Sequence, residues 1–199
     1  MPTEIELKAV LSDPVTVRMR LLSIGAEVRF RGAMSDRRYD RGGELAARDE
    51  VLRLRTFHGP GDRADAVLGW KGSVRRSAGG YKEREEVELA VGTGASAAAA
   101  FLAALGYVVV HEIDRWVEVL QLAGTVARLE GYPRMDDLIE VEGQPGAIER
   151  TIAVTGIPRS EFSADSLAEF ARRYETRTGR TAALAAAGGS IHPPAWASA

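Results

Sequence analysis

Several short segments of the chain place a charged residue at every second position, with apolar residues between them. Residues 4–8 read Glu-Ile-Glu-Leu-Lys, and residues 139–142 read Ile-Glu-Val-Glu. In a β-strand, alternate side chains point to opposite faces, so the charges of each segment share one face. The same sorting recurs at 52–55 and 84–89, and a weaker copy lies at 128–130. With Lys71 and Arg115 added, these faces carry seven acids, Glu4, Glu6, Glu86, Glu88, Glu130, Glu140 and Glu142, and seven bases, Lys8, Arg53, Arg55, Lys71, Arg84, Arg115 and Arg128.

Acids and bases in such numbers suit an anionic ligand that carries metal ions. Closely spaced carboxylates suit Mg²⁺ or Mn²⁺, which prefer oxygen ligands, whereas Arg forks and Lys ammonium groups bind phosphate oxygens. A polyphosphate with bound metal fits both signs of charge. The alternative is a set of half-buried strands whose charged faces simply lie in water. Against this alternative, five strands carry charges at successive same-face positions, with few Thr, Ser or Gln among them.

These charges need a framework that holds them on one surface. Alternation predicts eight strands, at 3–10, 27–40, 51–57, 66–74, 81–91, 107–121, 125–130 and 138–143. Helical spacing of apolar residues predicts four helices, at 13–24, 96–105, 147–155 and 165–174. Asp13 and Asp165 are the expected N-caps. The order of elements is not that of a parallel α/β sheet, so we expect an α+β fold with mostly antiparallel strands. If the helices cover the apolar face, the sheet can curl into a barrel with a charged lumen.

Length and composition are typical of one globular domain. The 199 residues are 45% hydrophobic and 27% charged, with a formal net charge of -2. This near-neutral charge argues against a nucleic-acid surface that works by bulk electrostatics. The chain has no cysteine, which excludes disulfides, a thiolate nucleophile and Cys-ligated metal clusters. We expect a single domain at 1–180 and a disordered Ala-, Gly- and Pro-rich tail at 181–199.

The sequence also favours a cytoplasmic protein that does not cross a membrane. Charges at Glu4, Glu6 and Lys8 stand where a signal peptide would need an apolar run. No uncharged apolar stretch reaches the roughly 18 residues that a membrane-spanning helix needs. We expect either a monomer or a homodimer.

The charged blocks, taken in order, resemble the CYTH family, the triphosphate tunnel metalloenzymes. Residues 4–8 resemble the ExExK signature that opens the family, and Tyr39-Asp40 and residues 52–55 resemble its YFD and LRIR segments. Residues 69–72, Gly-Trp-Lys-Gly, resemble its single-lysine strand. Residues 84–88, Arg-Glu-Glu-Val-Glu, resemble its REExE strand, and residues 126–143 resemble its closing pair of strands. ExExK alone is not specific, but its occurrence in order with the five blocks that follow it is.

This resemblance implies an eight-stranded antiparallel β-barrel, open at both ends, with helices packed outside. Family members hydrolyse inorganic or thiamine triphosphate, remove the RNA 5′ γ-phosphate, or cyclise ATP as class IV adenylyl cyclases. By carry-over, the seven acids named above, Glu4, Glu6, Glu86, Glu88, Glu130, Glu140 and Glu142, would hold Mg²⁺ or Mn²⁺. The seven bases, Lys8, Arg53, Arg55, Lys71, Arg84, Arg115 and Arg128, would line a small-molecule triphosphate. The resemblance places catalysis on Glu4, Glu6, Lys8 and Glu88.

Three positions depart from the family pattern. Glu130 stands where Asp is usual, and Ile113-Asp114-Arg115 stands where the family has a basic pair, so one lumen cation is missing. A Gly-Leu-Gly turn is replaced by Arg134-Met135-Asp136, which could supply Arg134 from a loop. None of these changes removes a metal carboxylate.

Three functions remain open on the sequence. The first is a metal-dependent phosphohydrolase acting on inorganic triphosphate or on an organic triphosphate such as thiamine triphosphate or a nucleotide. The second is a class IV-type adenylyl cyclase, and the third is a non-catalytic polyphosphate- or nucleotide-binding module. The first is favoured because the carboxylates are retained and no motif must read adenine. We interpret His58 and His111 as surface residues, and Arg75, Arg76 and Lys82 as part of a solvated loop.

Overall fold

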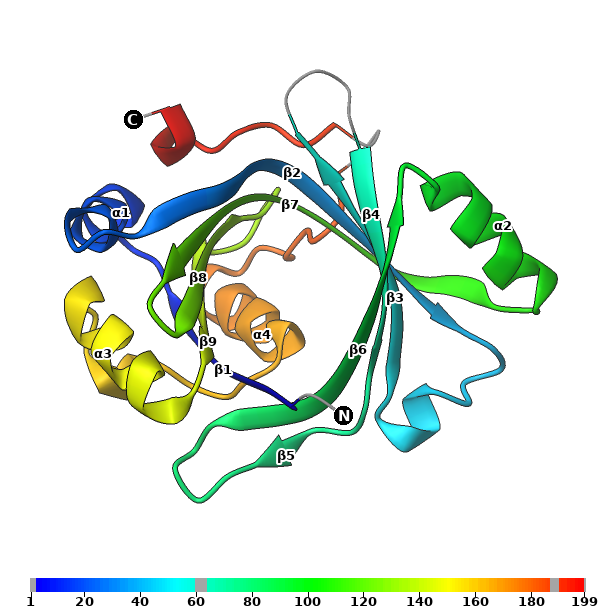
Figure 1. Cartoon of the computed structure of the whole chain (residues 1–199), viewed down its shortest axis with the longest axis horizontal. Helices are drawn as coiled ribbons and strands as arrows, with labels where there is room; N and C mark the ends of the chain where they lie inside the picture. The colour runs from blue at the N-terminus through cyan, green and yellow to red at the C-terminus, as the bar shows by residue number, and fades with distance from the viewer. Residues whose placement is uncertain (1–2, 60–63, 187–189, 199) are drawn as a thin grey trace.

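The alternating segments form strands of one antiparallel sheet (Figure 1). The structure, a computed structural model, describes residues 3–59, 64–186 and 190–198. The strands are β1 (Thr3–Val10), β2 (Glu27–Asp40), β3 (Val51–His58), β4 (Ala64–Lys71), β5 (Arg75–Arg76), β6 (Lys82–Gly92), β7 (Val108–Leu122), β8 (Thr125–Gly131) and β9 (Leu138–Gly143). The helices are α1 (Pro14–Ser23), α2 (Ala95–Ala104), α3 (Pro145–Thr155) and α4 (Leu167–Thr178). All eight predicted strands and all four predicted helices are present, with ends shifted by a few residues, and the two-residue β5 is additional.

The sheet closes on itself through eight of these strands. Neighbours run β1-β9-β8-β7-β2-β3-β4-β6, and a further pairing joins β6 back to β1. At the closure Glu4 lies opposite Arg84, and Glu6 lies opposite Lys82. The predicted α+β fold with an eight-stranded antiparallel barrel is therefore confirmed. β5 pairs only with β6, outside the ring.

The strand alternation sorts side chains between the outside and the lumen. On β1, Leu7 has no exposed surface and belongs to an apolar cluster with Leu21 of α1 and Ile152 of α3. On β3, Leu54 belongs to a second cluster with Leu102 of α2. Three helices thus cover part of the apolar outer face of the ring, because their buried side chains remove that part from water. Val87 and Leu89 on the outer face of β6 stay exposed.

Helix α4 is placed differently, across one mouth of the ring (Figure 1). Ser166, not the expected Asp165, is its N-cap, because Ser166 and Glu169 form a reciprocal capping box. The preceding segment is attached to β1 by two backbone hydrogen bonds between Ser163 and Lys8, of 2.8 and 2.9 Å. This attachment directs the first turn of α4 towards the lumen. The expected cap of α1 is confirmed, since the Asp13 side chain accepts a hydrogen bond from the Thr16 N–H.

Residues 181–186 and 190–198 pack against the barrel, which departs from the expectation of an unpacked tail. Ala183 and Arg134 form a two-way backbone bridge, and the Asp114 N–H donates to the Leu184 carbonyl at 2.7 Å. Trp196 is 6% exposed within the outer apolar cluster, and its indole N–H donates to Asp137 at 2.8 Å. Backbone pairing and one aromatic side chain provide this packing, and neither leaves a periodic pattern in the sequence.

No helix in the described part of the chain combines the length and the apolar character that crossing a bilayer requires.

Candidate active site in the charged tunnel

The lumen of the ring is a cavity of about 340 Å³ lined mainly by charged side chains. All seven acids and all seven bases singled out from the sequence line it. Their roles stay predictions, but their convergence follows from the register and the closure of the ring. The cavity is also lined by residues that the sequence analysis did not assign to a site, among them Asp36, Arg38, Lys82, His111 and Tyr132.

Three of the seven candidate metal ligands come together at one place. Glu4, Glu140 and Glu142 each offer a carboxylate oxygen, and these oxygens lie within 4.8 Å of one another. Glu4 is on β1, and the other two are on β9, which pairs with β1. Three carboxylate oxygens at this spacing are a suitable donor set for Mg²⁺ or Mn²⁺. We call these three residues the carboxylate cluster.

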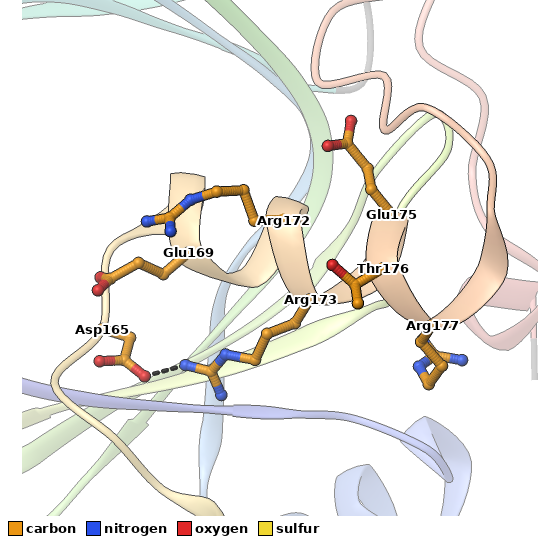
Figure 2. Close-up of a pocket in the computed structure, with 7 residues that line it drawn as sticks. All are labelled: Asp165, Glu169, Arg172, Arg173, Glu175, Thr176 and Arg177. Atoms are coloured by element: carbon orange, nitrogen blue, oxygen red, sulfur yellow. Dashed lines mark hydrogen bonds and ion pairs between the residues drawn. The ribbon is translucent and has the colours of Figure 1, made fainter.

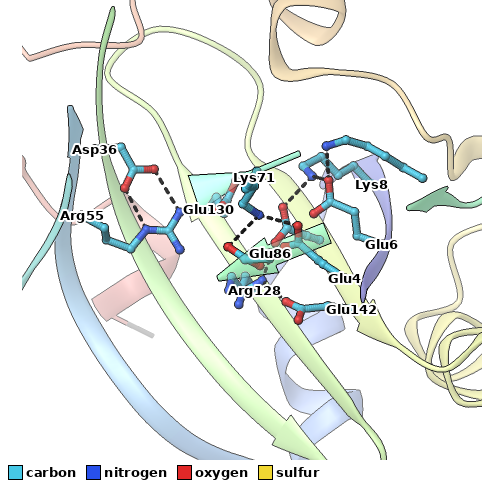
Figure 3. A network of polar contacts seen from close by, with 12 residues as sticks. Glu4, Glu6, Lys8, Asp36, Arg55, Lys71, Glu86, Arg128, Glu130 and Glu142 are labelled. Atoms are coloured by element: carbon cyan, nitrogen blue, oxygen red, sulfur yellow. Dashed lines mark hydrogen bonds and ion pairs between the residues drawn. The ribbon is translucent and has the colours of Figure 1, made fainter. Parts of the chain in front are cut away.

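Cations surround the carboxylate cluster in the structure. Lys71 of β4 forms an ion pair with Glu4, and Figure 3 shows its ammonium group between Glu4 and Glu86. Arg128 of β8 donates to Glu140 at 2.5 Å and to Glu142 at 2.6 Å. Each cluster carboxylate thus has a basic partner on a neighbouring part of the tunnel wall, contributed by a strand other than its own.

Burial and neighbouring charges shift the pKa values of two cluster carboxylates in opposite directions. Burial by itself would raise the pKa of Glu140, but Lys8 and Arg128 outweigh it and hold this pKa well below its usual range. Lys8 Nζ lies 2.6 Å from Glu140. The pKa of Glu142 is instead raised, first by burial and then by Glu140 and Glu4, against the opposing effect of Arg128. Two neighbouring carboxylates with opposed shifts are typical of a functional site rather than of a solvated face.

The other four candidate metal ligands also have basic partners in the tunnel, two of which, Lys8 and Lys71, contact the carboxylate cluster as well. Glu6 pairs with Lys8 at 2.6 Å and with Lys82. Arg53 donates to both Glu86 and Glu88, at 3.3 and 3.2 Å. These three acids and Glu130 lie outside the carboxylate cluster, so within the described residues the structure does not bring all seven acids around one ion.

Glu130 belongs to a chain of buried ionic contacts across β8, β7, β2 and β3. Its carboxylate accepts hydrogen bonds from Arg115 at 3.0 Å and from Tyr132 at 2.5 Å. Arg115 also donates to Asp36 at 3.1 Å, and Asp36 in turn accepts two hydrogen bonds from Arg55 (Figure 3). Although burial opposes it, Arg55 and Arg115 hold the pKa of Asp36 well below its usual range. This series of ionic contacts therefore holds two phosphate-binding candidates, Arg55 and Arg115, in defined positions.

Arg84 is held mainly by backbone carbonyls, with the Asp49 carboxylate 3.8 Å from its Nη2. Its Nε donates to the Gly72 carbonyl at 2.5 Å, and its Nη2 donates to the Asp49 carbonyl at 2.5 Å. Asp49 is the non-glycine residue with positive φ in the described part of the chain, at 54°. Arg84 thus joins two loops at the rim of the tunnel. The suggested loop cation Arg134 does not line the tunnel, because its Nε donates to the Thr181 carbonyl.

Two residues that we interpreted as solvated side chains in fact line the tunnel. Lys82 lies opposite Glu6 in the β1–β6 pairing, and it shares the strand parity of Arg84. His111 keeps an exposed side chain at the tunnel wall. Partial desolvation there, together with the charge of Arg38, lowers its pKa. The sequence signal for Lys82 was its position two residues before Arg84, which places both side chains on the same face of the strand. Arg75 and Arg76 are exposed, in agreement with the prediction for that segment.

A second, larger hollow of about 640 Å³ lies along the outer face of α4 (Figure 2). Its lining includes Asp165, Arg173 and Arg177, which are already engaged in ion pairs: Arg173 with Asp165, and Arg177 with Asp136. Both arginine side chains are more than half exposed. Such solvated ion pairs attract a charged ligand only weakly, because water and salt screen their charges. The candidate site is therefore the tunnel.

Comparison with known proteins gives structural matches only. No protein-family profile matches the chain, and no curated protein sequence matches it either. A candidate adenylate cyclase from Vibrio parahaemolyticus superposes with a TM-score of 0.68 at 19% identity, over 84% of this chain and 96% of that one. The PH1819 protein from Pyrococcus horikoshii gives 0.67 at 20% identity, over 89% and 99%. HpAC1 from Hippeastrum, a candidate adenylyl cyclase with a dominant triphosphatase activity, gives 0.60 at 20% identity, over 92% and 99%. These matches, together with the closed eight-stranded ring and its charged lumen, show that the chain has the CYTH, or triphosphate tunnel, fold.

Proposed function

We propose that this chain is a divalent-metal-dependent hydrolase of a triphosphate, inorganic or organic, that binds in the tunnel. The observation that carries the proposal is the carboxylate cluster of Glu4, Glu140 and Glu142 in a cavity that Lys and Arg side chains also line. A triphosphate with a bound metal ion presents both charges that such a cavity complements. The triphosphatase activity of HpAC1, which has the same fold, supports this choice.

The carboxylate cluster would hold Mg²⁺ or Mn²⁺. Its oxygen donors fit these hard cations, and its surrounding cations, Lys8, Lys71 and Arg128, would pair with phosphate oxygens of the bound anion. A bound divalent ion supplies Lewis-acid polarisation of a phosphoryl oxygen.

The basic side chains contribute by being fixed before the substrate arrives. Arg55 and Arg115 use Nε and Nη2 in their contacts with acids, which leaves their Nη1 groups able to donate to an anion. In phosphoryl transfer, charge develops on the oxygens of the transferred group, and prepositioned cations stabilise that charge without reorganising. In this proposal the carboxylate cluster binds the metal ion, and the two fixed arginines stabilise the charge that develops on the phosphate.

A second candidate function is an adenylyl cyclase that converts ATP to cyclic AMP and pyrophosphate. The observation in its favour is the fold shared with candidate adenylate cyclases, including the one from Vibrio parahaemolyticus. The same tunnel would bind the triphosphate of ATP, so the two functions differ in which bond breaks. A binding module without catalysis is the third candidate.

The deciding experiment compares products from inorganic triphosphate and from ATP. Purified protein is incubated with each substrate and Mg²⁺ or Mn²⁺, at neutral and alkaline pH, and products are separated by ion exchange. We expect orthophosphate from inorganic triphosphate to form faster than cyclic AMP from ATP, and chelation by EDTA to abolish the activity. Cyclic AMP as the dominant product, with triphosphate untouched, would establish the cyclase instead. Metal-dependent binding of triphosphate without any turnover would leave the binding module.

A further inference from the structure

One partly buried cation of the tunnel wall has no partner among the described residues. Arg38 of β2 lines the cavity, and its Nε is excluded from solvent without a hydrogen-bond partner. The described residues also place no carboxylate within ion-pair distance of its guanidinium group. The other lumen cations differ in this respect: Arg55, for example, is bound at two points by Asp36.

A second unpartnered donor lies next to Arg38. In the pairing of β2 with β3, Arg38 is directly opposite Arg53, and the Nε of Arg53 is also buried without a hydrogen-bond partner. Both side chains line the same cavity. Two buried guanidinium N–H groups on adjacent strands, both unsatisfied, form a site for an anion, because a buried donor without an acceptor is destabilising.

The charges around Arg38 support this reading. Burial, together with the positive charges of Arg53, Arg115 and Arg84, lowers the pKa of Arg38 to about 10, against the opposing effect of Asp36. Burial also lowers the pKa of Arg53, and the neighbouring Arg55 adds to that shift. The charged forms of the two guanidinium groups are therefore disfavoured by their surroundings, and an anion between them would relieve their repulsion.

The ring places this pair on the wall opposite the carboxylate cluster. From β1 to β2 one path around the ring crosses β9, β8 and β7, and the other crosses β6, β4 and β3. Strands β1 and β2 are therefore diametrically opposed, with Glu4 on one and Arg38 on the other. An anion that contacts both walls must be extended, as a chain of linked phosphates is.

We propose that Arg38 and Arg53 together bind one phosphate group of the tunnel's anionic ligand through their Nε N–H groups, opposite the carboxylate cluster. Arg38 is then an anion-binding residue of this chain, contributed by β2. The inference rests on the proposed function only for the identity of the ligand as a triphosphate, and it does not require hydrolysis.

The test is a binding measurement in which no reaction occurs. Inorganic triphosphate is titrated calorimetrically into the protein in EDTA, and the melting temperature is measured without ligand. Arg38→Met, which keeps an unbranched stem and removes the charge, should weaken binding by about tenfold or more, as for loss of a charge-assisted hydrogen bond. The ligand-free variant should melt no lower than the wild type, because the substitution removes an uncompensated buried charge. A purely structural residue would not show this combination.

The control is Arg29→Met, on the same strand. Arg29 has a side chain that is 61% exposed and pairs only with Glu27 among the described residues, so triphosphate affinity should not change. Unchanged affinity in Arg38→Met would overturn the proposal, and so would a clearly lower melting temperature of its ligand-free form. Arg38→Gln provides the same comparison with a different side-chain volume. Wild-type protein that binds triphosphate without hydrolysing it would contradict the proposed function but not this inference.

Discussion

Asp36 of β2 and Arg55 of β3 form a two-point ion pair in the tunnel wall, with Nε to Oδ1 at 2.8 Å and Nη2 to Oδ2 at 3.0 Å. Both residues are almost completely buried. The same carboxylate also accepts a hydrogen bond from Arg115. One acid therefore pairs with and orients two of the cations that we assign to phosphate binding, before any ligand binds. This preorganisation makes Asp36 a positioning residue of the site.

Asp36→Asn should be strongly destabilising. The substitution keeps the shape of the side chain but leaves Arg55 without a charged partner and Arg115 with Glu130 alone. Removing one partner of a buried ion pair costs about 3–5 kcal/mol. Urea unfolding followed by circular dichroism measures the loss. The control is Glu44→Gln, which breaks the exposed pair with Arg41 and should leave the unfolding free energy nearly unchanged. A loss no larger than in the control would contradict the positioning role.

Stability should fall in acid because Asp36 and Glu140 have lowered pKa values in the folded protein. A carboxylate with a lower pKa in the folded than in the unfolded state contributes stability above its unfolded pKa. That contribution is lost as the pH falls towards the folded pKa. From these groups we expect no change above about pH 5 and a progressive loss below about pH 4. Glu142, with a raised pKa, opposes this trend.

Urea unfolding at a series of pH values measures this acid sensitivity. Asp36→Asn should show a smaller loss of unfolding free energy in acid than the wild type, because one of the carboxylates with a lowered pKa has been removed. An equal loss in both proteins would mean that Asp36 is not linked to acid unfolding.

Glu142→Gln should impair metal binding while leaving the fold intact. Glu142 is the least buried member of the carboxylate cluster, with a side chain 27% exposed, and Gln preserves its volume. We expect weaker Mn²⁺ binding by calorimetry and a fall of about 100-fold in phosphate release, typical of losing one preorganised electrostatic group. The matched control is again Glu44→Gln, on the protein surface. Wild-type Mn²⁺ affinity in Glu142→Gln would exclude this carboxylate as a ligand.

Leu54→Asp should prevent folding, whereas Arg53→Met should not. Leu54 is 5% exposed in the apolar cluster beneath α2, and a carboxylate there would be buried without a partner. Arg53 lies on the opposite face of the same strand, in the tunnel. Far-ultraviolet circular dichroism and thermal melting separate the two outcomes. A folded Leu54→Asp protein together with an unfolded Arg53→Met protein would reverse the assignment of the two faces.

Trp196→Ala tests the packing of the C-terminal segment. The indole ring is 6% exposed in the outer apolar cluster, and truncation of a buried Trp costs about 3–5 kcal/mol. We expect a lower melting temperature with the tunnel chemistry unchanged. His192→Ala, an exposed substitution in the same segment, is the control. Equal melting temperatures for wild type and Trp196→Ala would show that this segment does not stabilise the barrel.

The sequence alone determined which side of each strand is charged. Alternation is a local property of extended backbone, so Glu6 and Leu7 must point in opposite directions whatever their neighbours are. The same locality explains why the eight strands of the ring and the four α-helices were predicted, and why residues with clean alternation, such as Arg53 and Glu140, were assigned to the tunnel. Asp36 and Arg38 were missed because Arg37 between them is also polar, which removes the apolar partner that would reveal the face.

Only the tertiary structure decided which charges meet. Glu130, like Glu140, is an acid on the charged face of an alternating strand, yet it contacts Arg115 and Tyr132 rather than the carboxylate cluster. Partners across a barrel depend on strand register, on the stagger of neighbouring strands and on where the ring closes. These are relations between segments far apart in the chain, and no spacing within one segment encodes them. The sequence therefore determined a set of charged faces, and ring closure decided which of those charges form the carboxylate cluster and which only hold other side chains in place.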